Sequence, residues 1–149
     1  MIFLTVSVLA LSFPGCGKKE NTSERTLRVG IVTYTQDDPF INTMTEQIRE
    51  DLKLKESKDM KILVSVKNGD NDQRDQDELV EEMIAAGCDV LCVNLVDRTA
   101  PSDIIKAARQ EKIPVIFFNR EPVKEDLMQW DQLYYVGCDA KQSGEMQGE

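Results

Sequence analysis

The chain has 149 residues, with 18 basic and 27 acidic side chains, no histidine and a formal net charge of −9. A hydrophobic content of 41% and a charged content of 30% fit a globular protein of about one domain, and they exclude a disordered chain or one with several membrane spans. The acidic balance argues against nucleic acid as a partner, because nucleic acid binding needs clustered Lys and Arg. The lack of histidine excludes Ser-His-Asp and Cys-His catalysis and metal sites built on His.

The first 15 residues carry no charged side chain and include an apolar run over 2–11. This run is shorter than the roughly 20 residues of a membrane-spanning helix, but it has the size of a signal-peptide core, so we expect 1–15 to be a signal peptide. A small residue, Cys16 and then a polar stretch resemble a bacterial lipoprotein processing site. That resemblance implies that Cys16 is lipidated and that 16–26 form a polar tether. The alternative is that 1–16 form a buried strand or helix, with Cys16 an ordinary thiol.

Beyond the tether, five short apolar runs rich in β-branched residues are separated by more polar segments. Nearly continuous apolar runs indicate strands buried on both faces, as in parallel sheets. The expected strands are 27–34, 61–66, 89–95, 113–118 and 133–137.

Helical patterns fill the first three gaps between these runs, with apolar residues at three- and four-residue steps. These residues are Ile41, Met44, Ile48 and Leu52, then Leu79, Met83 and Ala86, then Ile104, Ile105 and Ala108. Gly87 is a natural C-cap, and Pro101 suits a first turn. The alternation predicts a layered α/β domain with right-handed crossovers. Cys88, Cys92 and Cys138 lack the two-residue spacing of zinc or redox pairs, so we expect buried small hydrophobic residues.

Ligands of such sheets bind outside the carboxyl ends of the strands. This rule selects four polar segments, 35–40, 68–72, 94–97 and 119–122, all rich in carboxylates and amides. None of them contains the Gly-rich loop that a dinucleotide or a nucleoside triphosphate needs. Neither the dinucleotide fingerprint nor the Walker motif is therefore present.

A sugar offers hydroxyls that donate and accept, together with an apolar face of C–H groups. A carboxylate and an amide can bind the hydroxyls, while an aromatic ring packs on the apolar face. Asp38, Phe40 and Asn119 supply these three elements at two strand ends. The alternative is structural: Asp38 is the N-cap of a helix that begins near Pro39, and Phe40 packs into the core.

Several motifs resemble those of the periplasmic galactose/glucose-binding proteins. The similarity runs through 29–34 with 37–40, then 71–76, 93–97, 115–122 and 134–148, and so covers about 27–149. The resemblance implies the N-terminal lobe of a type I periplasmic binding protein, a three-layer Rossmann-like α/β fold with a parallel sheet. It also implies that Asp38 and Asn119 bind sugar hydroxyls and that Phe40 stacks on the ring, while Asn94 and Asp97 shape the loop.

Members of this family are about twice as long and hold the sugar between two lobes that close around a hinge. The resemblance therefore implies a truncated lobe, over 27–149, that binds galactose or glucose weakly or not at all alone and exposes a sheet edge. No cofactor or metal is expected, because the family's calcium site lies in the second lobe. The implied partners are a hexose and the membrane subunits of an ABC importer, in the periplasm or cell envelope with a lipid anchor.

Two other functions compete with the importer component. The same fold serves as a sugar-sensing lobe that presents its ligand to a chemoreceptor. An enzyme would need a pair of carboxylates, as in glycosidases, and the candidates are Asp37, Asp38, Asp97 and Glu121. The resemblance implies no catalysis.

Overall fold

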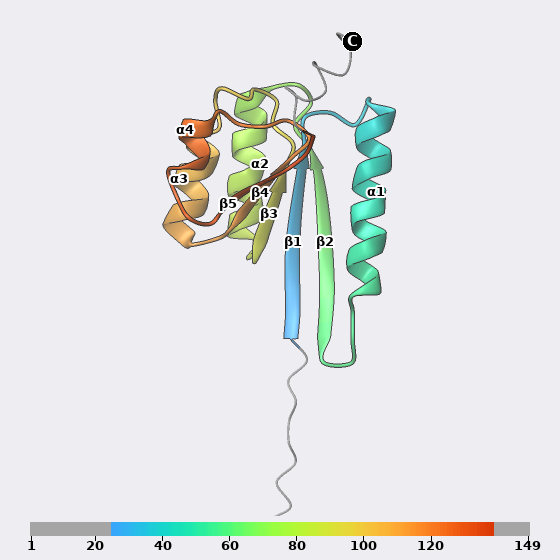
Figure 1. Cartoon of the computed structure of the whole chain (residues 1–149). Helices are drawn as coiled ribbons and strands as arrows, with labels where there is room; N and C mark the ends of the chain where they lie inside the picture. Colours follow the sequence, from blue (N-terminus) through green and yellow to red (C-terminus); the bar gives the residue numbers. More distant parts are fainter. Residues whose placement is uncertain (1–24, 139–149) are drawn as a thin grey trace, which may run out of the picture.

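The computed structural model describes residues 25–138 (Figure 1). The predicted signal peptide, Cys16 and the tether up to residue 24 lie outside the described residues, as does 139–149. The strands are β1 (Arg25–Thr33), β2 (Met60–Asn68), β3 (Val90–Val93), β4 (Val115–Phe118) and β5 (Leu133–Val136). The helices are α1 (Pro39–Leu54), α2 (Gln73–Ala85), α3 (Ser102–Glu111) and α4 (Lys124–Leu127).

The five strands form one parallel sheet in the order β2-β1-β3-β4-β5. Helix α1 covers one face of the sheet, and α2, α3 and α4 lie on the other (Figure 1). This arrangement confirms the predicted three-layer α/β fold. The chain leaves β1 for α1 on one face and leaves β3 for α3 on the other, so the strand order reverses between β1 and β3. Ligands of open α/β sheets bind beside such a reversal.

The ends of the elements differ from the predicted ones. Strands β1 and β2 are longer than expected, because nine residue pairs from Arg25↔Met60 to Thr33↔Asn68 form a continuous ladder that backbone groups make regardless of side-chain polarity. Strand β3 ends at Val93, because the chain turns into a loop at Asn94. The single turn of α4 was not predicted, since four residues are too few to show a helical period.

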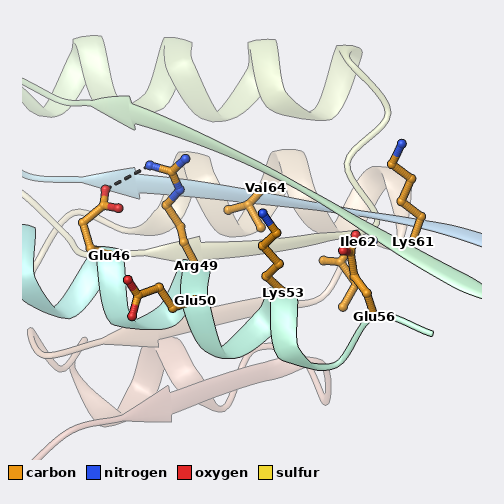
Figure 2. A pocket seen from close by; sticks show the side chains of 8 residues that line it. All are labelled: Glu46, Arg49, Glu50, Lys53, Glu56, Lys61, Ile62 and Val64. Carbon is orange, nitrogen blue, oxygen red and sulfur yellow. Dashed lines mark hydrogen bonds and ion pairs between the residues drawn. The ribbon is translucent and has the colours of Figure 1, made fainter.

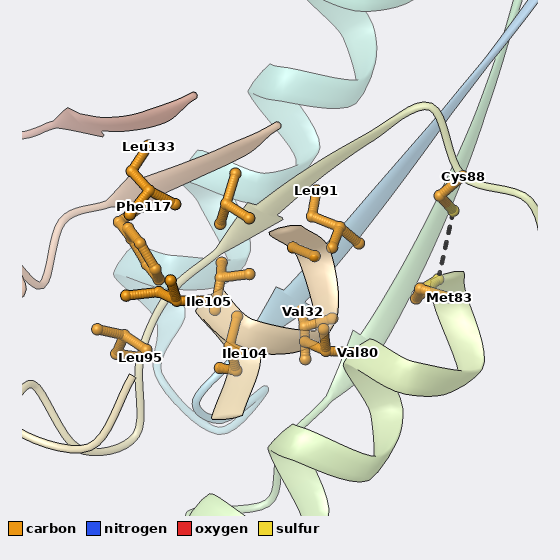
Figure 3. Close-up of a cluster of buried hydrophobic side chains, with 13 residues drawn as sticks. Val32, Val80, Met83, Cys88, Leu91, Leu95, Ile104, Ile105, Phe117 and Leu133 are labelled. Atoms are coloured by element: carbon orange, nitrogen blue, oxygen red, sulfur yellow. Dashed lines mark hydrogen bonds between the residues drawn. The ribbon is translucent and has the colours of Figure 1, made fainter. Parts of the chain in front are cut away.

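The main hydrophobic core lies between the sheet and helices α2 and α3 (Figure 3). Phe117 from β4 is fully buried in it, together with Leu91 and Leu95 from the β3 region and Ile104 and Ile105 from α3. A second, smaller cluster lies under α1, with buried members Val29, Ile31, Ile62 and Phe118. Trp130 is partly buried and packs against the main core.

Local capping explains where the first two helices begin. The carboxylate of Asp38 accepts backbone N–H bonds at the start of α1, and that of Asp72 does the same at the start of α2. Gly87 has φ = +77° just beyond the end of α2, as expected for a residue that follows a helix C-terminus. No helix in residues 25–138 has the length and apolarity needed to cross a membrane.

The three described cysteines have different environments. Cys88 is buried and Cys92 is largely covered, and burial raises the pKa of the Cys92 thiol to about 11. The prediction of burial is wrong for Cys138, which is exposed because it follows the last strand at the carboxyl edge of the sheet. On β5, Tyr134 and Val136 are 51% and 63% exposed.

Candidate functional site

The candidate site lies at the carboxyl edge of the sheet, where β1, β3 and β4 end side by side. Three connections meet there: 34–38 after β1, 94–98 after β3 and 119–123 after β4. The predicted segments 35–40, 94–97 and 119–122 overlap these connections. The fourth predicted segment, 68–72, is joined to the first connection by the hydrogen bond from the Asn71 N–H to the Tyr34 carbonyl at 2.8 Å.

Asp38 uses one carboxylate oxygen to cap helix α1 and the other to accept from a tyrosine. Its Oδ1 accepts from the backbone N–H of Phe40 at 2.8 Å and of Ile41 at 3.4 Å. Asp38 is therefore the N-cap of α1, as the structural alternative for this residue predicted. Its Oδ2 accepts from the Tyr34 hydroxyl at 2.6 Å. The Tyr34 hydrogen bond, followed by the backbone N–H of Phe40, lowers the pKa of Asp38. Because a carboxylate oxygen has two lone pairs, Oδ2 can accept a further hydrogen bond from a ligand.

Phe40 lies in the first turn of α1 and is 60% exposed. The alternative that this side chain packs into the core is therefore wrong. An exposed phenyl ring next to a carboxylate provides a flat apolar surface beside a hydrogen-bond acceptor. That combination suits a ligand with one polar edge and one apolar face.

Asn119 follows β4 with φ = +62°, in the left-handed region that asparagine tolerates better than most residues. The Nδ2 of Asn94 donates to Asn119 Oδ1 at 3.2 Å and to the Phe118 carbonyl at 3.1 Å. Asn94 is fully buried, so this contact comes from the protein interior and fixes the Asn119 amide. Within the described part of the chain, the Asn119 Nδ2 is left available to donate to a ligand.

Tyr34 and Arg120 hold the loops together, and sequence reasoning missed both. The Arg120 guanidinium lies 3.6 Å from the centroid of the Tyr34 ring. Its Nη1 donates to the carbonyls of Leu95 at 3.2 Å and Val96 at 2.9 Å, so the side chain connects the loops after β1, β3 and β4. Their only sequence signal is that each lies within two residues of a strand end.

Hydrogen bonds of Asn94 and Asp97 shape the loop after β3, as predicted. The carboxylate of Asp97 accepts from the backbone N–H and the hydroxyl of Thr99, at 2.8 and 2.7 Å. The fully buried side chain of Gln76, which was not predicted, donates to the Asn94 carbonyl and accepts from the Val96 N–H, both at 3.0 Å.

Two of the four carboxylates considered for an enzyme, Asp38 and Asp97, have lowered pKa values. A glycosidase needs one carboxyl with a raised pKa and one that stays ionised. Hydrogen bonds lower the pKa of Asp38, and those from Thr99 lower the pKa of Asp97. Both groups are therefore hydrogen-bond acceptors at neutral pH. Residues 25–138 contain no group of three acidic, histidine or cysteine side chains that could hold a metal ion.

A hollow lies elsewhere, between α1 and β2 (Figure 2). It has a volume of about 500 Å³ and is lined largely by charged side chains, among them Glu46, Arg49, Lys53 and Lys61. None of the three predicted site residues lines it. The ring of Phe40, by contrast, is exposed at the carboxyl edge of the sheet.

The comparisons with known proteins agree with this description. The sequence profile described as "Periplasmic binding protein domain" matches residues 29–149. The chain therefore belongs to the periplasmic binding protein domain family, whose members bind solutes and are not enzymes.

Two curated relatives show the range within the family. The chain is 35% identical over 122 residues to the D-galactose/methyl-galactoside binding periplasmic protein MglB of Haemophilus influenzae, covering 82% of this chain and 36% of that protein. It is 26% identical over 125 residues to the ribose import binding protein RbsB of Bacillus subtilis, covering 80% of this chain and 39% of that protein.

Solved structures agree in fold. A carbohydrate transporter solute-binding protein from Chloroflexus aurantiacus, in complex with D-glucose, matches with a TM-score of 0.65 and 28% identity, over 83% of this chain and 34% of that one. A galactofuranose binding protein matches with a TM-score of 0.69 and 21% identity, over 82% of this chain and 39% of that one, which supports the fold alone. The chain thus spans little more than a third of the length of these proteins.

Proposed function

We propose that the carboxyl edge of this sheet is one wall of a hexose site in the solute-binding component of a sugar importer. The observation that carries the proposal is that the exposed ring of Phe40 lies at the same sheet edge as the side chains of Asp38 and Asn119. Hydrogen bonds from Tyr34 and Asn94 fix these two side chains. The relative with 35% identity is described as binding galactose and methyl-galactoside. Galactose and glucose are therefore the first ligands to test.

The proposed site is one-sided. Small-molecule sites bury most of their ligand, and this wall is an open surface. Each hydrogen bond that an opposing lobe would add contributes roughly 1–3 kcal/mol, and each 1.4 kcal/mol changes the dissociation constant tenfold. Contacts from this wall alone are expected to give millimolar affinity or weaker, whereas the two-lobed protein would reach the micromolar range.

Saturation of NMR chemical shifts by glucose and by galactose tests the proposal, because it detects millimolar binding. We expect shifts at the backbone amides of Phe40, Asn119 and their neighbours, and none at α1 residues near Leu54. Saturable shifts confined to another face, or no shift for either sugar at high concentration, would contradict the proposed site. Micromolar affinity for the full chain would contradict the need for a second lobe.

Replacing Phe40 with alanine is expected to weaken hexose binding about three- to tenfold, because one face of the sugar loses its aromatic contact. Stability should change by less than about 0.5 kcal/mol, since the ring is largely exposed. Leu54→Ala is the matched control, because Leu54 is also an exposed apolar residue of α1 and lies at the helix's other end. Equal sugar affinity of the Phe40→Ala variant and the parent protein would remove Phe40 from the site.

The location of the protein is part of the same proposal. A signal peptide over 1–15 and a lipid on Cys16 would place the domain in the periplasm, attached to a membrane and within reach of importer subunits. The support is the charge-free apolar run followed by a small residue, a cysteine and a polar stretch. Mass spectrometry of the protein extracted from membranes tests this, because the mature N-terminus should be an acylated Cys16. An unmodified chain beginning at Met1 would contradict it.

A further inference from the structure

The end of the fold opposite to the candidate site carries a concentration of positive charge. We call it the basic end and define it as residues 25–28 and 52–63, which are the start of β1, the end of α1 and the turn into β2. It has six basic residues, Arg25, Arg28, Lys53, Lys55, Lys58 and Lys61, against Glu56 and Asp59. Its formal charge is therefore +4, whereas the rest of the chain has 12 basic and 25 acidic residues and carries −13.

Backbone contacts hold these segments together. The Arg25 N–H donates to the Asp59 carbonyl at 3.0 Å, and the ladder between β1 and β2 continues from there through Thr26↔Lys61. Lys53 on α1 and Lys61 on β2 line the hollow of Figure 2 together with Glu50 and Glu56. Lys55 and Lys58 lie in the connection between α1 and β2, and the other four cations lie on β1, α1 and β2.

The positive charges of this end are exposed and not neutralised by ion pairs within residues 25–138. All six basic side chains are exposed, and the ion pairs of the described structure involve Arg49, Lys67 and Arg74 instead. Nearby acidic groups bind backbone: Glu56 accepts from the Ile62 N–H at 2.9 Å, and Asp89, which borders the basic end, accepts from the Arg28 N–H at 2.7 Å. The positive electrostatic potential of these cations favours an anionic partner.

An apolar side chain stands among these cations. Leu54 is the last residue of α1, lies between Lys53 and Lys55, and is 81% exposed. Lys53 and Lys55 flank Leu54 in the sequence, and Asp51 and Glu50 precede it by one turn on α1. At a membrane interface, cations meet anionic headgroups while an apolar group enters the boundary with the acyl chains. A nucleic acid or an acidic peptide would use the charges and leave Leu54 in water.

We propose that the basic end docks on an anionic phospholipid surface, with Leu54 entering the headgroup boundary. Strand β1 begins at Arg25, so the chain joins the fold at this end. With the proposed lipid on Cys16, the nine residues 16–24 reach at most about 30 Å, which would keep the basic end near the bilayer at a high effective concentration. Docking in this orientation points the carboxyl edge of the sheet away from the membrane, where a sugar and a second lobe have free access.

Lysine acetylation read by mass spectrometry tests the docking on the full chain bound to vesicles. The vesicles contain either phosphatidylcholine alone or phosphatidylcholine with phosphatidylglycerol. We expect labelling of Lys53, Lys55, Lys58 and Lys61 to fall at least fivefold on the anionic vesicles, because each lysine near such a surface gains about a fivefold preference for it. Labelling of Lys106 and Lys124, outside the basic end, should stay the same. High salt should abolish the difference.

Variants separate docking from general charge effects. The triple replacement Lys53→Gln, Lys55→Gln and Lys58→Gln should restore Lys61 labelling, and Leu54→Ser should restore it in part. A control triple, Lys106→Gln, Lys112→Gln and Lys124→Gln, removes the same charge elsewhere and should leave the protection intact. Equal labelling on both vesicles, or equal effects of the two triples, would overturn the proposal. Cys16→Ser distinguishes it from the lipid anchor, since docking on anionic vesicles should survive loss of the anchor.

Discussion

Replacing Asp38 with asparagine is expected to weaken hexose binding by about ten- to a hundredfold without unfolding the domain. The carboxylate is the only charged acceptor among the three proposed contacts, and hydrogen bonds to charged groups contribute about 1.5–3 kcal/mol. Asparagine is as good an N-cap as aspartate, so helix α1 should keep its start. Sugar titration followed by NMR measures the affinity, and urea unfolding measures the stability.

Two further variants assign the loss of affinity to the carboxylate. Asp37→Asn removes the same charge one residue earlier and should leave the affinity within about twofold, because Asp37 belongs to the same loop but is not a proposed contact. Asp38→Ala should cost roughly 1 kcal/mol of stability in addition to the affinity, since alanine cannot cap. Unchanged affinity in Asp38→Asn would contradict the proposed role and leave capping as the function of this side chain.

Tyr34 is expected to control the pH range over which Asp38 is ionised. Its hydroxyl is the main cause of the lowered pKa of Asp38, so Tyr34→Phe should raise that pKa towards the ordinary value. The favourable contribution of the ionised carboxylate is present above the ordinary pKa and is lost as the pH falls through the lowered one. In the variant, the contribution to stability is smaller and its loss is complete at a higher pH. The Asp38 carboxyl carbon shift followed against pH checks this, with Tyr134→Phe as control and an unchanged titration as the contrary result.

The fold was predictable because its signals are local and strong. Each of the five strands was found from a run of β-branched and apolar residues, since strands buried on both faces cannot contain many polar residues. The ends were not predictable from this signal. Lys67 is polar and exposed and still lies within β2, because its backbone pairs with Val32 in the ladder. Pairing partners far away in the sequence determine where such a strand ends.

The site was predictable only in part. Parallel topology brings the segments that hold Asp38 and Asn119 to one edge, so their neighbourhood follows from the order of elements. The contact between Tyr34 and Arg120 joins residues 86 positions apart and has no period or motif, so nothing in one sequence indicates it. The exposure of Cys138 was missed because its local composition resembles that of the buried cysteines. Its place just beyond β5 decides its environment.

Replacing Phe117 with alanine is expected to lower the free energy of unfolding by about 3–5 kcal/mol. The ring is fully buried where β4 meets α3, and its removal leaves a cavity that the surrounding strands and helices fill only in part. Domains of this kind are stable by about 5–15 kcal/mol, so the variant would lose a large share of the total. Urea unfolding followed by the fluorescence of Trp130, which packs against the same core, measures the loss.

The matched control is Phe40→Ala, the same chemical change at a ring that is 60% exposed. It should shift the unfolding midpoint little, because the ring leaves no buried cavity, while it weakens sugar binding. Phe117→Ala should act in the opposite way, with lower stability and the same sugar affinity for the fraction that remains folded. Comparable stability of both variants would mean that the core under α2 and α3 does not hold the domain together. Comparison of the two variants thus distinguishes a residue that stabilises the lobe from one that is proposed to bind its ligand.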